Sequence, residues 1–203
     1  MKLHGDLLSP FVRMSMVTAL ECGLGSRVQL VATMVKPQLV NQDLTRLSPI
    51  GKVPALETDH GHPIYDSRVI MEYFCHVAGN KSLLPDEGSK HFKVLTLLAL
   101  SAGMGDAAVA LRYESFARPE ATRWPDYDAR LRLRIAACMD DIESHWLDML
   151  AEPNLGNIAA AVVLGYIDLR NLAPDWRKSR PGLARWHETF TKRESMMHTV
   201  PQA

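Results

Sequence analysis

The stretch GKVPALETDHGHPIYDSRVI, residues 51–70, predicts a β-hairpin that leads directly into a helix. The runs Pro54–Thr58 and Pro63–Tyr65 flank Asp-His-Gly, a turn signal, so we expect them to pair as antiparallel strands. The proline that begins the second run has no backbone N–H, which favours the edge of a sheet. Asp66 and Ser67 then form an N-cap pair that predicts the start of a helix.

Upstream of the hairpin, the chain predicts a strand, a helix and a second strand. Lys2–Gly5 is a weak strand signal and Val28–Ala32 a clear one. Between them, Pro10–Cys22 has apolar residues at helical spacing, with Ser9 as its N-cap. This order with a short connection predicts a right-handed parallel unit. A weak helix over Leu39–Leu47 completes the prediction of a βαβββα domain over residues 1–78.

Beyond residue 78 the pattern changes. Residues 79–88 are rich in turn formers and predict a linker. Residues 89–203 show no strand pattern and predict an all-helical domain, so the fold class is α/β followed by all-α. Leu155–Leu169 is apolar on nearly all sides, which predicts a buried central helix. The other helices predicted in this domain are 91–112, 125–151 and 181–193.

Composition and charge exclude several classes of protein. Apolar residues make up 47% of the 203 residues, enough for a hydrophobic core. Lys plus Arg and Asp plus Glu each number 23, so neither a general nucleic-acid binder nor a polybasic membrane anchor is indicated. The longest nearly apolar stretch, Ile158–Ile167, is shorter than the roughly 18–20 residues that span a bilayer. The N-terminus lacks a signal-peptide pattern. We therefore expect a soluble, cytoplasmic protein with no nucleic-acid or membrane partner.

The cysteines and histidines indicate no metal centre. Cys22, Cys75 and Cys138 are odd in number and far apart, with no CxxC motif. They predict neither a disulfide framework nor a zinc site, and they fit a reducing compartment. His60 and His62 share the hairpin, but no third ligand is evident in the sequence.

The start of the first predicted helix could stabilise a thiolate. By itself, Ser9 followed by proline is a common helix start. A helix N-terminus also presents unpaired N–H groups and the positive end of its dipole, and both stabilise an anion. The Ser9 hydroxyl could donate one more hydrogen bond to a bound sulfur, worth about 1.5–3 kcal/mol. At about 1.4 kcal/mol per unit, this bond would lower a thiol pKa by one to two units. The serine then acts as a donor and not as a nucleophile.

Two later segments suit a peptide-like ligand. By itself, the Val53-Pro54 pair is a loop that enters a strand. A cis bond there would expose the Val53 backbone N–H and C=O for strand addition. By itself, the Asp66-Ser67 pair caps a helix. The Ser67 hydroxyl and the first helical N–H groups also suit a carboxylate, and the Asp66 carboxylate suits an ammonium group. Together these groups suit an α-amino-acid end.

Taken in order, these motifs resemble the cytosolic glutathione S-transferase family, in a serine-type form with Ser-Pro-Phe. The resemblance spans nearly the whole chain and is carried by residues 9–13, 47–56, 65–70, 154–159 and 181–186. It implies a thioredoxin-like βαβββα N-terminal domain, an all-helical C-terminal domain and a homodimer. It also implies glutathione as a co-substrate and no metal.

The resemblance implies a role for each candidate site residue. Ser9 would be the catalytic hydroxyl that stabilises the glutathione thiolate. The glutathione-binding residues would be Lys52 at the glycyl carboxylate, Val53 with cis Pro54 at the cysteinyl backbone, and Asp66 and Ser67 at the γ-glutamyl end. Some relatives use a polar residue from the segment around residues 38–42, which spacing alone does not identify here.

The chain departs from the family pattern in three places. Related thiol transferases have cysteine where this chain has Ser9, which disfavours reduction of mixed disulfides and favours conjugation or peroxide reduction. Asn154 and Asn157 replace the usual Ser/Thr and Asp of a helix-capping motif. Asparagine caps about as well, so we expect folding to survive. Asp66 replaces the commoner glutamate and is one methylene shorter.

The resemblance implies a glutathione transferase that attacks electrophilic small molecules or peroxides, as in detoxification. The alternative is a catalytically weak binding or regulatory module with the same fold. A glutaredoxin-like reductase is disfavoured because Cys22 lies at the far end of its helix and Cys75 in the expected core. A second substrate would lie against the helix that begins near residue 91, whose apolar residues also suit a helical core.

Overall fold

The computed structural model describes residues 1–202, which form two units. Unit 1 comprises Met1–His91 together with the C-terminal segment that begins at Glu194, and unit 2 comprises Phe92–Arg193. The sequence predicts one helical domain over residues 89–203, whereas the segment that begins at Glu194 lies with unit 1.

Unit 1 is built on a four-stranded sheet with the strand order β2-β1-β3-β4. The strands are β1 (Lys2–Gly5), β2 (Gln29–Ala32), β3 (Ala55–Glu57) and β4 (Pro63–Ile64). β1 pairs with β2 in parallel, as the strand–helix–strand order predicts, and β3 is antiparallel to β1 and to β4. The hairpin and the edge position of its second strand are therefore confirmed.

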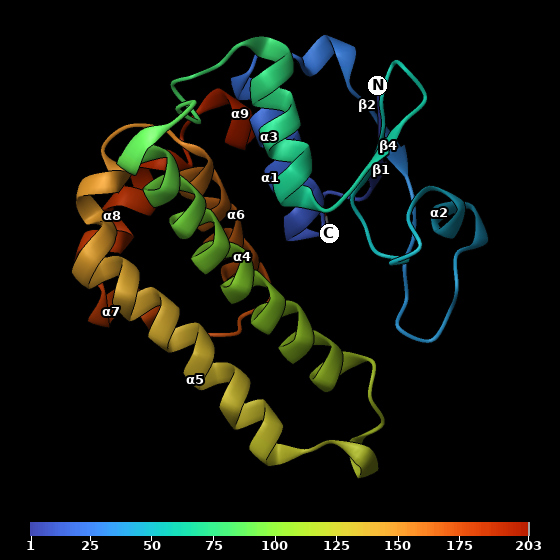
Figure 1. Cartoon of the computed structure of the whole chain (residues 1–203). Helices are drawn as coiled ribbons and strands as arrows, with labels where there is room; N and C mark the ends of the chain where they lie inside the picture. Colours follow the sequence, from blue (N-terminus) through green and yellow to red (C-terminus); the bar gives the residue numbers. More distant parts are fainter. Residues whose placement is uncertain (203) are drawn as a thin grey trace. The chain divides into compact units, whose positions relative to one another are not determined.

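Four helices and one 3-10 turn accompany the sheet: α1 (Pro10–Glu21), η1 (Gly25–Arg27), α2 (Gln42–Leu47), α3 (Ser67–Ala78) and α9 (Glu194–Met197). α1 and α3 pack together, while α2 lies on the other side of the sheet (Figure 1). α2 begins later than the predicted residue 39, because the Asn41 side chain caps it by accepting a hydrogen bond from the Leu44 N–H at 3.0 Å.

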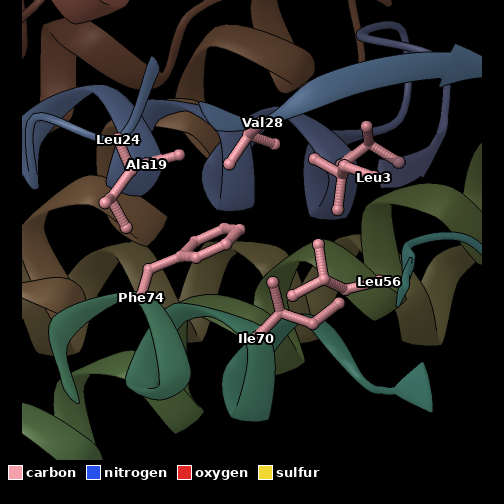
Figure 2. Packing of buried hydrophobic residues seen from close by; sticks show 8 residues of the cluster. Leu3, Ala19, Leu24, Val28, Leu56, Ile70 and Phe74 are labelled. Carbon is pink, nitrogen blue, oxygen red and sulfur yellow. The ribbon is translucent and has the colours of Figure 1, made fainter. Parts of the chain in front are cut away.

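The core of unit 1 lies between the sheet and helices α1 and α3. Leu3 and Leu56 from the strands face Ile70 and Phe74 of α3, and all four side chains have no exposed surface (Figure 2). Burying one such side chain contributes about 1.5–3 kcal/mol. This packing places the N-terminal ends of α1 and α3 relative to the sheet.

The C-terminal segment packs on α1 through a buried arginine. Arg13 donates from Nη2 to the Met196 carbonyl at 3.1 Å and from Nε to Thr199 Oγ1 at 3.4 Å. Burial lowers the pKa of Arg13 below its ordinary value. At the start of α9, Ser195 Oγ donates to the Glu21 carboxylate at the end of α1. These contacts explain why the segment from Glu194 belongs to unit 1.

Unit 2 contains helices and no strand over Phe92–Arg193, as predicted. Its elements are α4 (Gly88–Phe116, which begins in unit 1), η2 (Glu120–Thr122), α5 (Pro125–Asp141), η3 (Ile142–Trp146), η4 (Leu147–Leu150), α6 (Leu155–Leu169), α7 (Trp176–Ser179) and α8 (Pro181–Phe190). α6 is the buried central helix that its composition predicts.

The predicted helix over residues 125–151 is not continuous. The α-helix ends at Asp141 and continues as a π-helical turn, η3, and a 3-10 turn, η4. Within η3, the Glu143 carboxylate accepts hydrogen bonds from the N–H groups of Gly182 at 3.0 Å and Leu183 at 2.6 Å. Glu143 thereby caps the start of α8, a long-range contact that periodicity along one segment cannot predict.

α4 corrects the expectation that no helix is long and apolar enough to span a membrane. It contains an 18-residue window of mean hydropathy 1.8, of which 56% is buried. Small residues such as Ser101 and Gly103 interrupt its apolar runs without lowering the mean hydropathy much. By length and composition it could cross a bilayer, but a buried core helix has the same features, so this is weak evidence for a membrane span.

Candidate functional site

The register of the sheet brings the predicted site segments to one end of it. Ser9 follows the C-terminal end of β1. β3 pairs Ala55 with His4, so Val53 lies just beyond the same end of β1. β4 pairs Ile64 with Leu56, so Asp66 continues past that end as well. The candidate residues therefore come from three separate segments that meet at the sheet end from which α1 and α3 begin.

Ser9 is the N-cap of α1, as predicted. It is half-buried, and its Oγ accepts a long hydrogen bond from the Val12 N–H at 3.5 Å. Within residues 1–202 its hydroxyl donates to no acceptor, so the proton is available to a ligand. Gly5 allows this close approach of helix to strand, because its φ is +149° and a Cβ would lie 2.3 Å from Val12 Cγ2.

The Val53–Pro54 peptide bond is cis, as the resemblance implies. Pro54 is buried, Val53 is half-buried against the core, and Lys52 is exposed. Within residues 1–202, the backbone N–H and C=O of Val53 pair with no other backbone group. Their hydrogen-bonding capacity is thus available at the sheet end.

Asp66 and Ser67 begin α3, as predicted. The Asp66 carboxylate accepts the Arg68 N–H at 3.0 Å and the Arg68 guanidinium at 2.8 Å from Nη2. These hydrogen bonds from Arg68 hold the pKa of Asp66 below its ordinary value, despite an opposing effect of burial. Ser67 is only 3% exposed. The Tyr65–Asp66 bond is also cis, a feature for which the sequence has no signal.

The structure adds Arg68 to the site and assigns apolar residues of α4 to a helical core. Sequence reasoning missed Arg68, although its position two residues after Asp66 is a detectable signal for a local ion pair. Met104, Ala108 and Leu111 of α4 have almost no exposed surface, so they are core residues of their helix. The exposed His60 and His62 belong to no cluster of three metal-ligating residues among residues 1–202.

Comparisons with known proteins identify similar chains. Residues 8–77 match the family model for the glutathione S-transferase N-terminal domain. The chain is 32% identical over 204 residues to the "Uncharacterized GST-like protein YibF" of Escherichia coli strain K12, covering 99% of this chain and 98% of that protein. It is also 35% identical over 98 residues to a glutathione S-transferase of Pseudomonas putida F1, covering 48% of this chain and 42% of that protein.

Solved structures are similar over the full length. A glutathione transferase family member from Pseudomonas fluorescens Pf-5, crystallised with bound glutathione, has a TM-score of 0.95 and 35% identity and covers 100% of this chain and 99% of its own. A glutathione S-transferase from Methylobacillus flagellatus KT, also with glutathione bound, has a TM-score of 0.88 and 30% identity, with 99% of both chains covered. Both similarities include the helical half as well as the sheet.

Proposed function

The chain belongs to the glutathione S-transferase family, and from this membership we propose that it is a glutathione transferase of the serine type. It binds glutathione at the sheet end described above and activates the thiol for attack on electrophilic small molecules or peroxides. The observation that carries the proposal is the convergence of Ser9, Val53 and Asp66 at one end of the sheet. Glutathione in the similar crystal structures supports the choice of ligand.

Thiol activation depends on Ser9 and the start of α1. The Ser9 hydroxyl donates to the glutathione sulfur, and the N-terminal end of the helix dipole favours the negative charge. Both effects stabilise the thiolate relative to the thiol, so they lower the thiol pKa. The bound thiolate is then held for attack on a second substrate, which adds the advantage of proximity.

The tripeptide is held along the same sheet end. The Val53 N–H and C=O pair with the cysteinyl backbone by strand addition. At the γ-glutamyl end, Ser67 and the first N–H groups of α3 bind the carboxylate, and Asp66 binds the ammonium. A carboxylate has four lone-pair sites, so Asp66 can retain its contact with Arg68 and accept the ammonium as well. Exposed Lys52 serves the glycyl carboxylate.

The same proposal includes a cytoplasmic homodimer with a role in detoxification. Glutathione is a co-substrate, and the reaction uses no metal. The second candidate function is a catalytically weak binding or regulatory module with the same fold. It is consistent with the same fold, because fold alone does not determine activity.

The test measures the thiol pKa of bound glutathione in the wild type and in Ser9→Ala. The thiolate absorbance is recorded as the pH is raised, and its midpoint gives the pKa. We expect the wild type to lower this pKa, and Ser9→Ala to raise it by about one to two units and reduce conjugation accordingly. Ser9→Thr, which keeps a hydroxyl N-cap, is the matched control and should recover most of the shift. A thiol pKa of bound glutathione that is unshifted in the wild type would contradict the transferase proposal and favour the catalytically weak module.

A further inference from the structure

Unit 2 contains a cavity between α5 and residues 172–180, the segment that includes α7 (Figure 1). Its volume is about 360 Å³, which is within the range of small-molecule pockets. Two hydrogen bonds join its walls: Arg132 Nη1 donates to the Leu172 carbonyl at 3.0 Å, and Arg180 Nη2 donates to the Ala136 carbonyl at 3.3 Å. The cavity is therefore held in place by the packing of unit 2 itself.

The floor of this cavity is apolar. Ile135 and Met139 come from α5, Leu172 and Trp176 come from the facing segment, and none of the four is more than 7% exposed. The Trp176 indole N–H already donates to Asp168 Oδ1 at 2.8 Å, so the ring adds only apolar surface. Such a floor favours a ligand with an apolar body.

Arg132, which also lines the cavity, has donors to spare. Its Nε donates to Asp128 at 2.7 Å and its Nη1 donates to the Leu172 carbonyl. Within residues 1–202, its Nη2 has no acceptor. A guanidinium has five N–H groups and no acceptor of its own. Arg132 can therefore donate to a ligand oxygen while it keeps both of these bonds.

Arg180 lines the cavity as well, and its hydrogen bonding is incomplete. The residue is 8% exposed, and its guanidinium forms an ion pair with Asp140 at 2.7 Å. Its Nε is buried and finds no acceptor in the part of the chain that the structure describes. Buried donors without a partner are rare in native proteins, so this one indicates a missing acceptor.

The charges around the cavity favour an anion over a cation. The two arginines are the cationic side chains that line it, and their acidic partners lie outside the lining. Asp175 is the acidic residue in the lining, but its side chain is 73% exposed and forms an ion pair with Lys178 at 2.7 Å. The positive charge of the lining is therefore only partly offset.

We propose that this cavity binds a small organic anion, a carboxylate on an apolar body. The apolar body lies on the floor, and the carboxylate accepts hydrogen bonds from Arg132 and Arg180. Guanidinium and carboxylate groups match in geometry, and their hydrogen bonds are strengthened by charge. The proposal does not depend on the glutathione site, because Ser9, Val53 and Asp66 belong to unit 1.

The experiment titrates the full-length chain, labelled with ¹³C at the methionine methyl groups, with benzoate. Met139 lines the cavity, so the ring of bound benzoate should shift its methyl signal, which Met139→Leu identifies. The signal of Met71, in unit 1, should not move. Benzamide has the same shape without the charge. It should bind at least about tenfold more weakly, because it loses the charge-assisted hydrogen bonds.

Three variants locate the site. Arg132→Gln should weaken benzoate binding at least about tenfold. Arg130→Gln is the matched control, because Arg130 is exposed on the same helix and does not line the cavity, so its affinity should equal that of the wild type. Ala173→Trp keeps both arginines but places a large side chain in the cavity, so it should abolish binding.

Three results would overturn the proposal. The first is a Met139 signal that does not respond to benzoate. The second is benzamide that binds the wild type as tightly as benzoate does. The third is equal benzoate affinity in Arg132→Gln and Arg130→Gln. The comparison of benzoate with benzamide uses the wild type alone, so it decides the question even if a variant fails to fold.

Discussion

Asp168, at the end of α6, binds two residues that come later in the chain. Its Oδ1 accepts the Trp176 indole N–H at 2.8 Å and Arg177 Nη1 at 2.7 Å, and its Oδ2 accepts Arg177 Nη2 at 2.6 Å. Burial raises the pKa of Asp168, but the hydrogen bonds from Arg177 and Trp176 outweigh it, so the pKa lies below its ordinary value. The buried Trp176 is thereby fixed at the start of α7.

We expect Asp168→Asn to lower the free energy of unfolding at pH 7 by about 1–3 kcal/mol. Because the folded-state pKa is depressed, the carboxylate stabilises the fold fully above its unfolded pKa of about 3.9. That contribution is lost as the pH falls through the lower, folded-state pKa. Urea unfolding at pH 7 and at several pH values below 4 measures the effect. The difference in unfolding free energy between variant and wild type should shrink as the pH falls.

Asp175→Asn is the control for this change, because the Asp175 side chain is 73% exposed and, among the described residues, forms an ion pair only with Lys178. It should have little effect at any pH. If the difference in unfolding free energy between Asp168→Asn and the wild type stays constant down to the lowest pH measured, the role assigned to the charge of Asp168 is contradicted.

At the scale of one element, the start of α6 depends on an amide and not on a carboxylate. Asn154 caps the helix by accepting the Asn157 N–H at 3.1 Å. Among the described residues, the Asn157 side chain forms no reciprocal hydrogen bond with Asn154. Its Nδ2 donates instead to the carbonyls of Glu152 at 2.7 Å and Leu150 at 3.3 Å. Aspartate, the usual family residue at position 157, has no such donor at neutral pH.

We therefore expect Asn157→Asp to destabilise the protein, although it restores the family pattern. Asn157 has no exposed surface, so the change places a carboxylate against two carbonyl oxygens. A buried charge without a partner costs about 3–5 kcal/mol. Thermal or urea unfolding measures the loss, and Asn171→Asp, the same change at an exposed position, is the control. An unfolding free energy equal to that of the wild type would mean that the loop before α6 rearranges to supply donors.

At the scale of the whole chain, the C-terminal segment supports the first helix of the sequence. Arg13 is 8% exposed, and both of its hydrogen-bond acceptors come from the segment that begins at Glu194. The hydrogen bonds of Arg13, and with them the packing around α1, therefore depend on the segment that begins at Glu194.

A chain that ends at Arg193 should be less stable by about 3 kcal/mol, because Arg13 loses its hydrogen-bond acceptors Met196 and Thr199. The measurement is the thermal unfolding midpoint together with glutathione affinity. A chain that ends at Pro201 retains Met196 and Thr199 and should match the wild type. Equal stability of both truncated chains would show that the contacts of Arg13 contribute nothing.

Prediction from the sequence succeeded where the signal is local. Ser9, Asp66 and Asn154 cap the helices that their positions indicate, because an N-cap bonds N–H groups within three residues. It failed for the helix over residues 125–151, because Glu143 caps α8 from a distant position. Likewise, no spacing rule relates Arg13 to the C-terminal segment.

The sequence by itself determined the order of strands and helices, the edge position of β4 and the chemical character of the candidate site. These features depend on turn residues, capping residues and proline, each of which acts on its immediate neighbours. Only the tertiary structure decided that Glu143 caps α8 and that the chain returns to α1 at its end. Such contacts depend on how helices pack on the sheet, and packing joins residues without regard to their separation in sequence.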